Sequence, residues 1–344
     1  MALAEPSVSV IIPVRNEETY IEKCLVSLLA QTYPGARYEI IVVEGRSSDS
    51  SKPLVEAVCR EHSNVRCIDN PAGIVPCAMN LGIRHAQGEI IIRADGHNTY
   101  PPDYIENCVQ CLEQTGADNV GGPLLTIAAD ESLGARMVAA VLTSPFGVGD
   151  SRFRTTSMEG YVDTVPFGAF RRTLFDRIGM YNEKLVRNQD VDLNARIRRA
   201  GGMIYQTPKL TTEYHPVAGF WQFLALTFRT SQWHLFSFSE NVRSLGARHF
   251  APALFVVGLS SALVGSIFHT SVFLAVLALL VIYLTTGFVI INSGTKNNQR
   301  GMALVLPLAC LCFHISYGLG TLAGARYLFS DPSSRPIRAG QEVA

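Results

Sequence analysis

The sequence predicts an α/β fold with a mainly parallel sheet, followed by helices of membrane composition. Two observations carry this prediction. In the front part of the chain, short apolar runs alternate with amphipathic helix patterns, which is the order of β-α units in a doubly wound sheet. Residues 249–295 and residues 301–325 contain no Asp, Glu, Lys or Arg, and uncharged stretches of this length are typical of membrane helices.

The β-α alternation begins close to the start of the chain. Residues 8–14, VSVIIPV, form a nearly continuous apolar run that favours a buried parallel strand. Residues 16–31 then repeat apolar side chains every three or four positions, which indicates an amphipathic helix with Asn16 as its expected cap. Further strands are expected at 39–43, 65–68 and 89–94, and further helices at 50–62 and 75–86.

The back of the chain contains three hydrophobic segments, at residues 251–268, 272–291 and 302–322. Since a bilayer core needs about 20 apolar residues per helix, these lengths favour membrane insertion over a buried core helix. We therefore predict four parts, with no secretory signal peptide before them. They are a cytoplasmic catalytic domain at 1–215, an amphipathic interfacial region at 216–248, membrane helices at 249–326 and a polar tail at 327–344.

The positive-inside rule gives conflicting indications for the orientation of the membrane part. Lys296 and Arg300 lie between the second and third segments and place this loop, with the front domain, in the cytoplasm. Three full spans would then export the tail, yet Arg326, Arg335 and Arg338 favour a cytoplasmic tail. Either the rule is weak here, or one of the segments is re-entrant. The expected location is the inner membrane, with several passes.

Charge argues against a nucleic-acid-binding protein, and cysteine content argues against a disulfide-bonded one. Residues 1–245 carry 23 Lys and Arg against 27 Asp and Glu, so a nucleic-acid partner is not expected. Eight cysteines fit a reducing compartment. Cys108 and Cys111 form a C-x-x-C inside a helical pattern, without a second pair or a nearby histidine, which favours structural thiols over a metal site.

Polar clusters follow three of the predicted strands, where ligands bind in open α/β sheets. They are PVRNEE at 13–18, EGRSSD at 44–49 and ADGH at 94–97. Asp95 and His97 could both contact one ion, and a carboxylate with an imidazole suits Mn²⁺ or Mg²⁺ on a diphosphate. A capping Asp and a surface His are the alternative. The glycine motifs of dinucleotide and P-loop sites are absent, which leaves a metal as the expected counterion of a phosphorylated ligand.

Several blocks together resemble family 2 glycosyltransferases of the GT-A fold. Residues 8–51 resemble the opening of that family, residues 80–105 its metal-binding segment, and residues 159–202 its acceptor-side and catalytic-base region. The blocks RADGH, NVGGP, SPFGVG, EGYVDTVPFGAF and RNQD are similar to the ExoA-like, succinoglycan-type exopolysaccharide subgroup. The resemblance covers residues 7–235.

The resemblance implies a role for each matching position. It places Pro13, Val14, Arg15, Glu17 and Glu44 at the nucleotide base and ribose, with Glu44 standing where the family usually has an Asp. Asp95 matches the first Asp of the family's D-x-D motif, which contacts ribose and metal, and His97 replaces the last one. Because this replacement removes a negative charge, we expect a shift from Mg²⁺ toward Mn²⁺.

Asp190 matches the catalytic Asp of the family, and Gln189 stands where a Glu usually precedes it. Without the resemblance, Asp190 and Asp192 would be interpreted as helix-capping residues. The implied chemistry is removal of the acceptor hydroxyl proton by Asp190 as that oxygen attacks the anomeric carbon. A single displacement of this kind inverts the anomeric centre.

Further candidates for diphosphate or acceptor contacts lie outside these blocks. Arg229, Gln232 and Trp233 could substitute in part for the Q-x-x-R-W motif of polymerising synthases, within an aromatic segment that fits either an interfacial helix or a core. His215 could be structural or functional. Arg152 and Arg154 are expected in a mobile Gly-rich loop, as phosphate contacts or as solvated charges.

Together these observations predict an inverting, metal-dependent enzyme. It would move a sugar from a nucleotide-sugar, expected to be a UDP-sugar, to a polyprenyl-diphosphate-linked saccharide in exopolysaccharide assembly. Two alternatives stay open. They are a polyprenyl-phosphate sugar synthase and a catalytically idle membrane scaffold.

Overall fold

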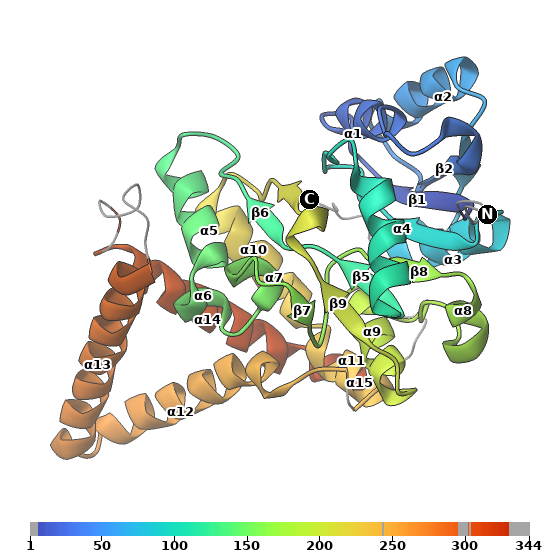
Figure 1. Ribbon diagram of the computed structural model, residues 1–344. Helices are drawn as coiled ribbons and strands as arrows, with labels where there is room; N and C mark the ends of the chain where they lie inside the picture. The colour runs from blue at the N-terminus through green and yellow to red at the C-terminus, as the bar shows by residue number, and fades with distance from the viewer. Residues whose placement is uncertain (1–5, 243, 295–301, 303, 330–344) are drawn as a thin grey trace. The chain divides into compact units, whose positions relative to one another are not determined.

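The computed structural model describes residues 6–242, 244–294, 302 and 304–329 (Figure 1). Within these residues the chain forms two compact units. The first contains the residues up to Leu125 and Thr156–His215. The second contains Thr126–Thr155 and the described residues from Pro216 onward.

An eight-stranded sheet in the order β3-β2-β1-β4-β8-β5-β9-β7 forms the centre of the first unit. The strands β1 to β4 pair in parallel, whereas β8 runs antiparallel to both β4 and β5. The expected mainly parallel α/β sheet is therefore confirmed, with antiparallel pairing at β8 and between β7 and β9. The strands are β1 (Val8–Val14), β2 (Tyr38–Glu44), β3 (Val65–Asp69), β4 (Ile90–Arg93), β5 (Asn119–Gly121), β7 (Gly160–Tyr161), β8 (Ala169–Arg171) and β9 (Ile204–Gln206).

Helices of the first unit connect these strands, and a two-stranded sheet of β6 (Leu124–Thr126) and β10 (Thr212–Tyr214) accompanies them. The helices are α1 (Ile21–Leu29), α2 (Ser51–Glu61), α3 (Val75–His85), α4 (Tyr104–Thr115), α8 (Thr173–Ile178) and α9 (Gln189–Arg199), with short 3-10 turns at Gly35–Arg37 and Pro208–Leu210. The helices and strands predicted up to residue 94 are all present.

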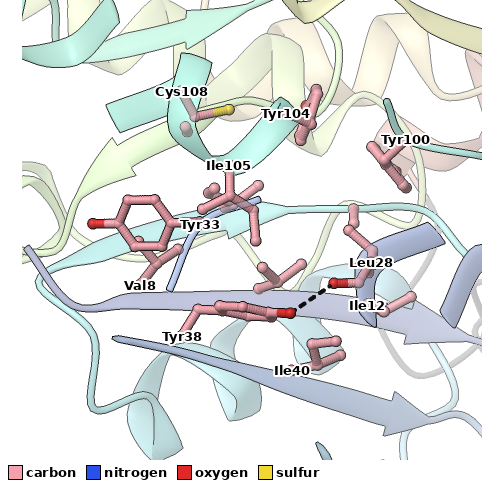
Figure 2. Close-up of a cluster of buried hydrophobic side chains, with 14 of the residues drawn as sticks. Val8, Ile12, Leu28, Tyr33, Tyr38, Ile40, Tyr100, Tyr104, Ile105 and Cys108 are labelled. Carbon is pink, nitrogen blue, oxygen red and sulfur yellow. Dashed lines mark hydrogen bonds between the residues drawn. The ribbon is translucent and has the colours of Figure 1, made fainter. Parts of the chain in front are cut away.

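Alternation along the strands sends side chains to two separate hydrophobic cores. In β1, Val8, Val10 and Ile12 pack on one face with residues of α1 and α4, while Ile11 packs on the other with α3, α8 and α9. Figure 2 shows the first core, where the Tyr38 hydroxyl donates to the Leu28 carbonyl at 3.2 Å. Both faces are covered, so these strands are apolar on both sides, as a parallel sheet requires.

Two local predictions were wrong. Asn16 does not cap α1, which begins at Ile21. Asn16 has φ 57° and its side-chain oxygen accepts a hydrogen bond from the Ser48 N–H at 2.8 Å, so it joins two loops instead. Arg152 and Arg154 lie in a short helix, α7 (Arg152–Thr155), where a mobile loop was expected. The backbone N–H groups of Arg154 and Thr155 donate to the Ser151 carbonyl and form this helical turn.

The second unit is helical in its described residues. Its elements are α5 (Leu133–Thr143), α6 (Pro145–Val148), α7, α10 (Phe220–Ser231), α11 (His234–Glu240), a 3-10 turn at Ala247–His249, α12 (Ala251–Ser266), α13 (Thr270–Gly294), α14 (Leu306–Ala323) and α15 (Arg326–Phe329). Helix α14 packs against α5, α6, α10, α12 and α13. The stretch Thr126–Thr155 thus folds with helices that follow it by more than 60 residues.

Two helical stretches in the described residues are long and apolar enough to cross a membrane. They are Thr270–Ser293, with mean hydropathy 2.7, and Leu306–Phe329, with mean hydropathy 1.5. Helix α12, the first of the three predicted segments, has 16 residues and is shorter than a perpendicular crossing needs. The two long stretches also differ in burial, since 17% of the first and 44% of the second is buried.

Candidate functional site

Two crossover loops meet at the carboxyl end of the parallel strands. Glu44, the last residue of β2, is 3% exposed, and its carboxylate accepts hydrogen bonds from the backbone N–H groups of Arg46 and Ser47 at 3.1 and 2.5 Å. The Glu17 N–H donates to Ser51 Oγ at 2.7 Å. Because these bonds fix the loops after β1 and β2, the polar groups at the carboxyl ends of these strands are held in place.

The loop after β4 adds Asp95 and His97 to this edge. His97 Nδ1 lies 3.1 Å from Glu17 Oε1. The Asp95 N–H donates to the Tyr100 hydroxyl at 2.7 Å, which fixes the backbone at the carboxylate. The Asn98 side chain is 1% exposed, and among the described residues neither its amide nitrogen nor its oxygen has a hydrogen-bond partner. The loop therefore holds a free amide beside the predicted metal ligands.

Arg93, the last residue of β4, joins the two carboxylates predicted to carry the chemistry. Its Nε and Nη2 donate to Asp95 Oδ1 at 3.2 and 3.1 Å, and its Nη1 donates to Asp190 Oδ1. The guanidinium carbon lies 5.7 Å from the ring centroid of Phe167. The Arg93 side chain is 5% exposed, so a buried cation brings Asp95 and Asp190 into one cluster.

Helix α9 places Asp190 in its first turn, and buried amides hold that helix. Asn119 Nδ2 donates to Asn194 Oδ1 at 2.7 Å, and Asn194 Nδ2 donates to Thr164 Oγ1 at 2.8 Å. Asp192 has a different task, because it pairs at 3.0 Å with Arg196, whose guanidinium donates to three carbonyls at the end of α8. Asp190, in contrast, pairs with Arg93.

Burial and charge shift the pKa values of two site residues. Burial raises the pKa of the Asp190 carboxyl, and the neighbouring charge of Asp95 adds to this, while Arg93 acts against it. For His97, burial lowers the pKa, but the hydrogen bond to Glu17 and the charge of Asp95 outweigh burial and leave the pKa raised. The two shifts differ in origin, since loss of solvent raises the pKa of Asp190, whereas acidic neighbours raise the pKa of His97.

The sequence of this chain is similar to known sequences. A sequence model of glycosyl transferase family 2 matches residues 9–179. The succinoglycan biosynthesis protein ExoA of Rhizobium meliloti (strain 1021) is 30% identical over 227 residues, which covers 64% of this chain and 68% of that protein. The chain belongs to glycosyltransferase family 2.

One further sequence relative and one solved structure extend the comparison. A Methanococcus voltae protein named dolichyl N-acetyl-alpha-D-glucosaminyl phosphate 3-beta-D-2,3-diacetamido-2,3-dideoxy-beta-D-glucuronosyltransferase is 25% identical over 229 residues, covering 64% of this chain and 70% of that protein. The mannosyltransferase PcManGT from Pyrobaculum calidifontis, solved in complex with GDP-Man and Mn²⁺, has a TM-score of 0.59 at 19% identity, over 91% of this chain and 87% of that chain. This structural likeness confirms the GT-A fold.

Most of the predicted donor-binding residues lie at the carboxyl ends of β1 and β2. Pro13 and Val14 end β1 beside Val43 and Glu44 of β2. Arg15 Nη1 donates to the Gly73 carbonyl at 3.0 Å, and a Cβ on Gly73, where φ is 66°, would lie 3.1 Å from that same nitrogen. The residues expected at base and ribose therefore lie at the ends of two adjacent strands and in the loop after β1, all in one unit.

Two candidates near the acceptor blocks also belong to the first unit. His215 stacks on Tyr20 with ring centroids 6.2 Å apart, and its Nε2 lies 3.8 Å from Glu213 Oε2. Gln189 is the first residue of α9 and is buried. Gln189 directly precedes Asp190 in the chain, and His215 directly follows Tyr214, whose ring centroid lies 6.3 Å from that of His97.

The remaining candidates, Arg152, Arg154, Arg229, Gln232 and Trp233, belong to the second unit. Trp233 is 5% exposed and packs against Tyr327 at a ring distance of 5.4 Å. Gln232 Oε1 accepts a hydrogen bond from the Tyr327 hydroxyl at 3.1 Å. These contacts give Gln232 and Trp233 a packing role inside the helical unit, and their contact with a ligand stays a prediction.

Sequence reasoning missed Arg93 and Tyr181 as site residues. Tyr181 is 3% exposed, and its hydroxyl has no hydrogen-bond partner among the described residues. Burial raises the pKa of this hydroxyl, and the charge of Asp190 adds to the rise. A signal for Arg93 existed in the sequence, because a charged residue directly follows three isoleucines of a buried strand. Such a residue needs a buried counter-charge.

The donor set at this edge fits a divalent cation only in part. The described residues contain no group of three or more His, Cys, Asp or Glu side chains placed to hold a metal. Asp95 and His97 would supply one carboxylate oxygen and one ring nitrogen. Because Mg²⁺ and Mn²⁺ often take their remaining ligands from substrate phosphates and water, two protein ligands fit a metal that arrives with a diphosphate.

Proposed function

We propose that this family 2 glycosyltransferase is an inverting, membrane-attached enzyme. It transfers one sugar from a UDP-sugar to a polyprenyl-diphosphate-linked saccharide during exopolysaccharide assembly. The pairing of Asp190 and Asp95 through Arg93 carries this proposal, because it puts a candidate general base beside the candidate donor site. The names of two relatives add support, one from succinoglycan biosynthesis and one that acts on a dolichyl-linked sugar.

Asp190 acts as the general base in this proposal. Its carboxylate takes the proton of the acceptor hydroxyl while that oxygen forms a bond to the anomeric carbon, and the bond from that carbon to the diphosphate breaks on the opposite face. Arg93 favours the ionised form of Asp190 and holds its orientation. An α-linked donor therefore gives a β-linked product.

Asp95 and His97 hold Mn²⁺ or Mg²⁺ in this proposal, with Asp95 also contacting the ribose. When bound, the ion neutralises charge that develops on the departing diphosphate. Glu17 keeps His97 in place through the 3.1 Å contact. Pro13, Val14, Arg15 and Glu44 line the nucleotide side.

Membrane attachment suits an acceptor that cannot leave the bilayer. An enzyme confined to the same membrane meets that acceptor at a raised effective concentration. The two long apolar helical stretches support this part of the proposal.

The deciding experiment compares wild type with Asp190→Asn in detergent. Binding of UDP-, GDP- and TDP-sugars is measured by calorimetry with and without Mn²⁺, and transfer is measured to a polyprenyl-diphosphate sugar. We expect metal-dependent binding of one donor by both proteins, and a loss of turnover of at least about 10²-fold in the variant. Wild-type turnover by Asp190→Asn would overturn the assignment.

The same assay separates the acceptor classes. Supplying polyprenyl phosphate in place of the diphosphate-linked sugar tests a polyprenyl-phosphate sugar synthase, and mild acid distinguishes the two products by mobility. Absence of any donor binding, hydrolysis or transfer by folded wild-type protein would favour an idle scaffold.

A further inference from the structure

Helix α14 packs against helices of the second unit at several points along its length, while Leu308 and Leu319 remain exposed. Phe223 of α10 stacks on Phe313 with ring centroids 5.4 Å apart, and Ser316 Oγ donates to the Leu224 carbonyl at 2.7 Å. Further along α14, Gly320 packs so closely against α10 that a Cβ at this position would lie 2.1 Å from Ser231 Oγ. Helix α10 thus follows α14 in the same direction at the closest spacing that helices allow.

The contacts continue past the end of α10 into α11. A Cβ on Gly324 would lie 2.1 Å from the Gln232 carbonyl oxygen. His234 Nδ1 lies 3.2 Å from Thr321 Oγ1, and His234 Nε2 lies 3.3 Å from the Tyr317 hydroxyl. The polar side chains of α14 therefore have protein partners.

The same holds at the other end of α14, where α6 and α13 supply the partners. His314 Nδ1 lies 2.7 Å from the Tyr283 hydroxyl, and its Nε2 lies 2.9 Å from the Gly147 carbonyl oxygen. Helix α5 also packs against α14.

The helices beside α14 carry exposed charge, which decides where α14 can lie. Arg229 on α10 and Arg136 on α5 are both exposed. If α14 crossed the bilayer, α10 would enter the hydrocarbon beside it together with Arg229, and α10 has only 12 residues. Charged side chains exposed to lipid are strongly disfavoured. Helices α10 and α14 are instead suited to the membrane–water interface, where one side of the pair can face water.

The pair α12 and α13 has the opposite character. Residues 249–295 are free of Asp, Glu, Lys and Arg. Side chains of α13 are largely exposed, with Leu274 at 57% and Ile282 at 58%, and the turn between the helices exposes Ile267 and Phe268 at 77% and 74%. In Figure 1 this turn lies at the lower left, at the corner of α12 and α13 farthest from α14.

We propose that the α12–α13 hairpin alone enters the bilayer, that α14 lies at the membrane interface as the core of the helical unit, and that both chain ends therefore stay on the cytoplasmic side. The partner of the exposed hairpin is bilayer hydrocarbon, since the exposed side chains around its turn include no Asp, Glu, Lys or Arg. The inference rests on the membrane attachment in the proposed function. It also removes the conflict in the positive-inside rule, because Lys296, Arg300 and the basic tail then share one side.

Sidedness is measured on the full chain with one epitope before Met1 and another after Ala344. In inverted membrane vesicles a protease should remove both epitopes, and in intact spheroplasts it should remove neither. Removal of the C-terminal epitope from spheroplasts would show an odd number of crossings and overturn the inference. Recovery of the protein in the soluble fraction would instead refute membrane attachment itself, so the two failures are distinguishable.

A matched pair of substitutions tests which helix contacts lipid. Ile282→Arg lies near the middle of α13, and Leu319→Arg, at a site 46% exposed, lies near the middle of the α14 stretch. After a carbonate wash, membrane-retained protein should fall about tenfold or more for Ile282→Arg and stay within about twofold of wild type for Leu319→Arg. Equal losses would mean that α14 crosses the bilayer. Release of wild type by carbonate would mean that another protein surface covers the hairpin.

Discussion

Arg93 determines the arrangement of the candidate site at the scale of single residues. It follows Ile90, Ile91 and Ile92 in a buried strand, where an isolated charge is costly. Its two carboxylate partners come from the next loop and from a helix 97 residues away. Residue type and strand position indicated Asp95 and His97 in advance, and the family resemblance indicated Asp190, but no local pattern shows that one guanidinium joins Asp95 to Asp190.

Replacing Arg93 should reduce turnover more than donor binding. Gln removes the charge that favours ionised Asp190, and Lys keeps the charge but cannot donate to both carboxylates through a planar fork. We expect kcat to fall about 10²-fold for Arg93→Gln and less for Arg93→Lys, with the donor KM within a few-fold. Steady-state kinetics with the identified donor measures both.

The control for the Arg93 substitutions is a more exposed arginine–aspartate ion pair. Arg177 pairs with Asp118, and the Arg177 side chain is 53% exposed. Arg177→Gln should cost at most about 1 kcal/mol of unfolding free energy and leave kcat unchanged. If both variants lose activity equally, Arg93 has no special place in the reaction.

His97→Asp should change the metal preference. An aspartate supplies an oxygen ligand and restores a negative charge, and Mg²⁺ prefers oxygen ligands more strongly than Mn²⁺ does. We expect the ratio of Mg²⁺- to Mn²⁺-supported activity to rise by about tenfold, measured across a concentration series of each ion. An unchanged ratio would separate His97 from the metal.

At the scale of elements, β1 to β4 and α1 to α3 follow from apolar periodicity, and their prediction was confirmed. The start of α1 was wrong because Asn16 bonds to Ser48, a contact between loops 32 residues apart. The same limit applies to α9. Two acidic residues marked its beginning, but the amide contacts of Asn194, which hold it, depend on Asn119 and Thr164 from distant segments. Local patterns give elements, whereas side-chain contacts between elements require the fold.

Asn194→Ala should loosen α9 and shift Asp190. It leaves the buried Asn119 amide and the Thr164 hydroxyl without these bonds, at a cost of about 1–3 kcal/mol. The melting midpoint should fall by several degrees, and kcat should fall more than donor affinity. Gln110→Ala, an exposed position on α4, is the control and should change neither. Unchanged kcat in a destabilised Asn194→Ala would show that α9 does not orient the base.

At the scale of the whole molecule, the described part of the chain passes between its two units three times. The predicted boundary at residue 215 remains a prediction, and the structure adds that Thr126–Thr155 groups with the later helices. The sequence of α5, LGARMVAAVLT, reads as an ordinary amphipathic helix, so composition alone could not assign it to α14.

Truncation after His215 should therefore yield a poorly behaved protein. It removes α10 and α14, against which α5 packs, and exposes buried residues such as Val138 and Val141. We expect aggregation in size-exclusion chromatography. The same truncation with 126–155 replaced by a short Gly/Ser linker should give a larger monomeric fraction. Equal monomer from both would mean that α5 is stable without α14.

This interleaving also constrains how such a gene can diversify. A single genetic crossover at one boundary would combine one half of the helical unit with a foreign second half, and α5 and α14 would no longer match. Exchange of the catalytic unit between relatives requires two replaced stretches at once. New sugar specificities in this lineage should therefore arise by point substitution within the unit, with the helical unit inherited unchanged.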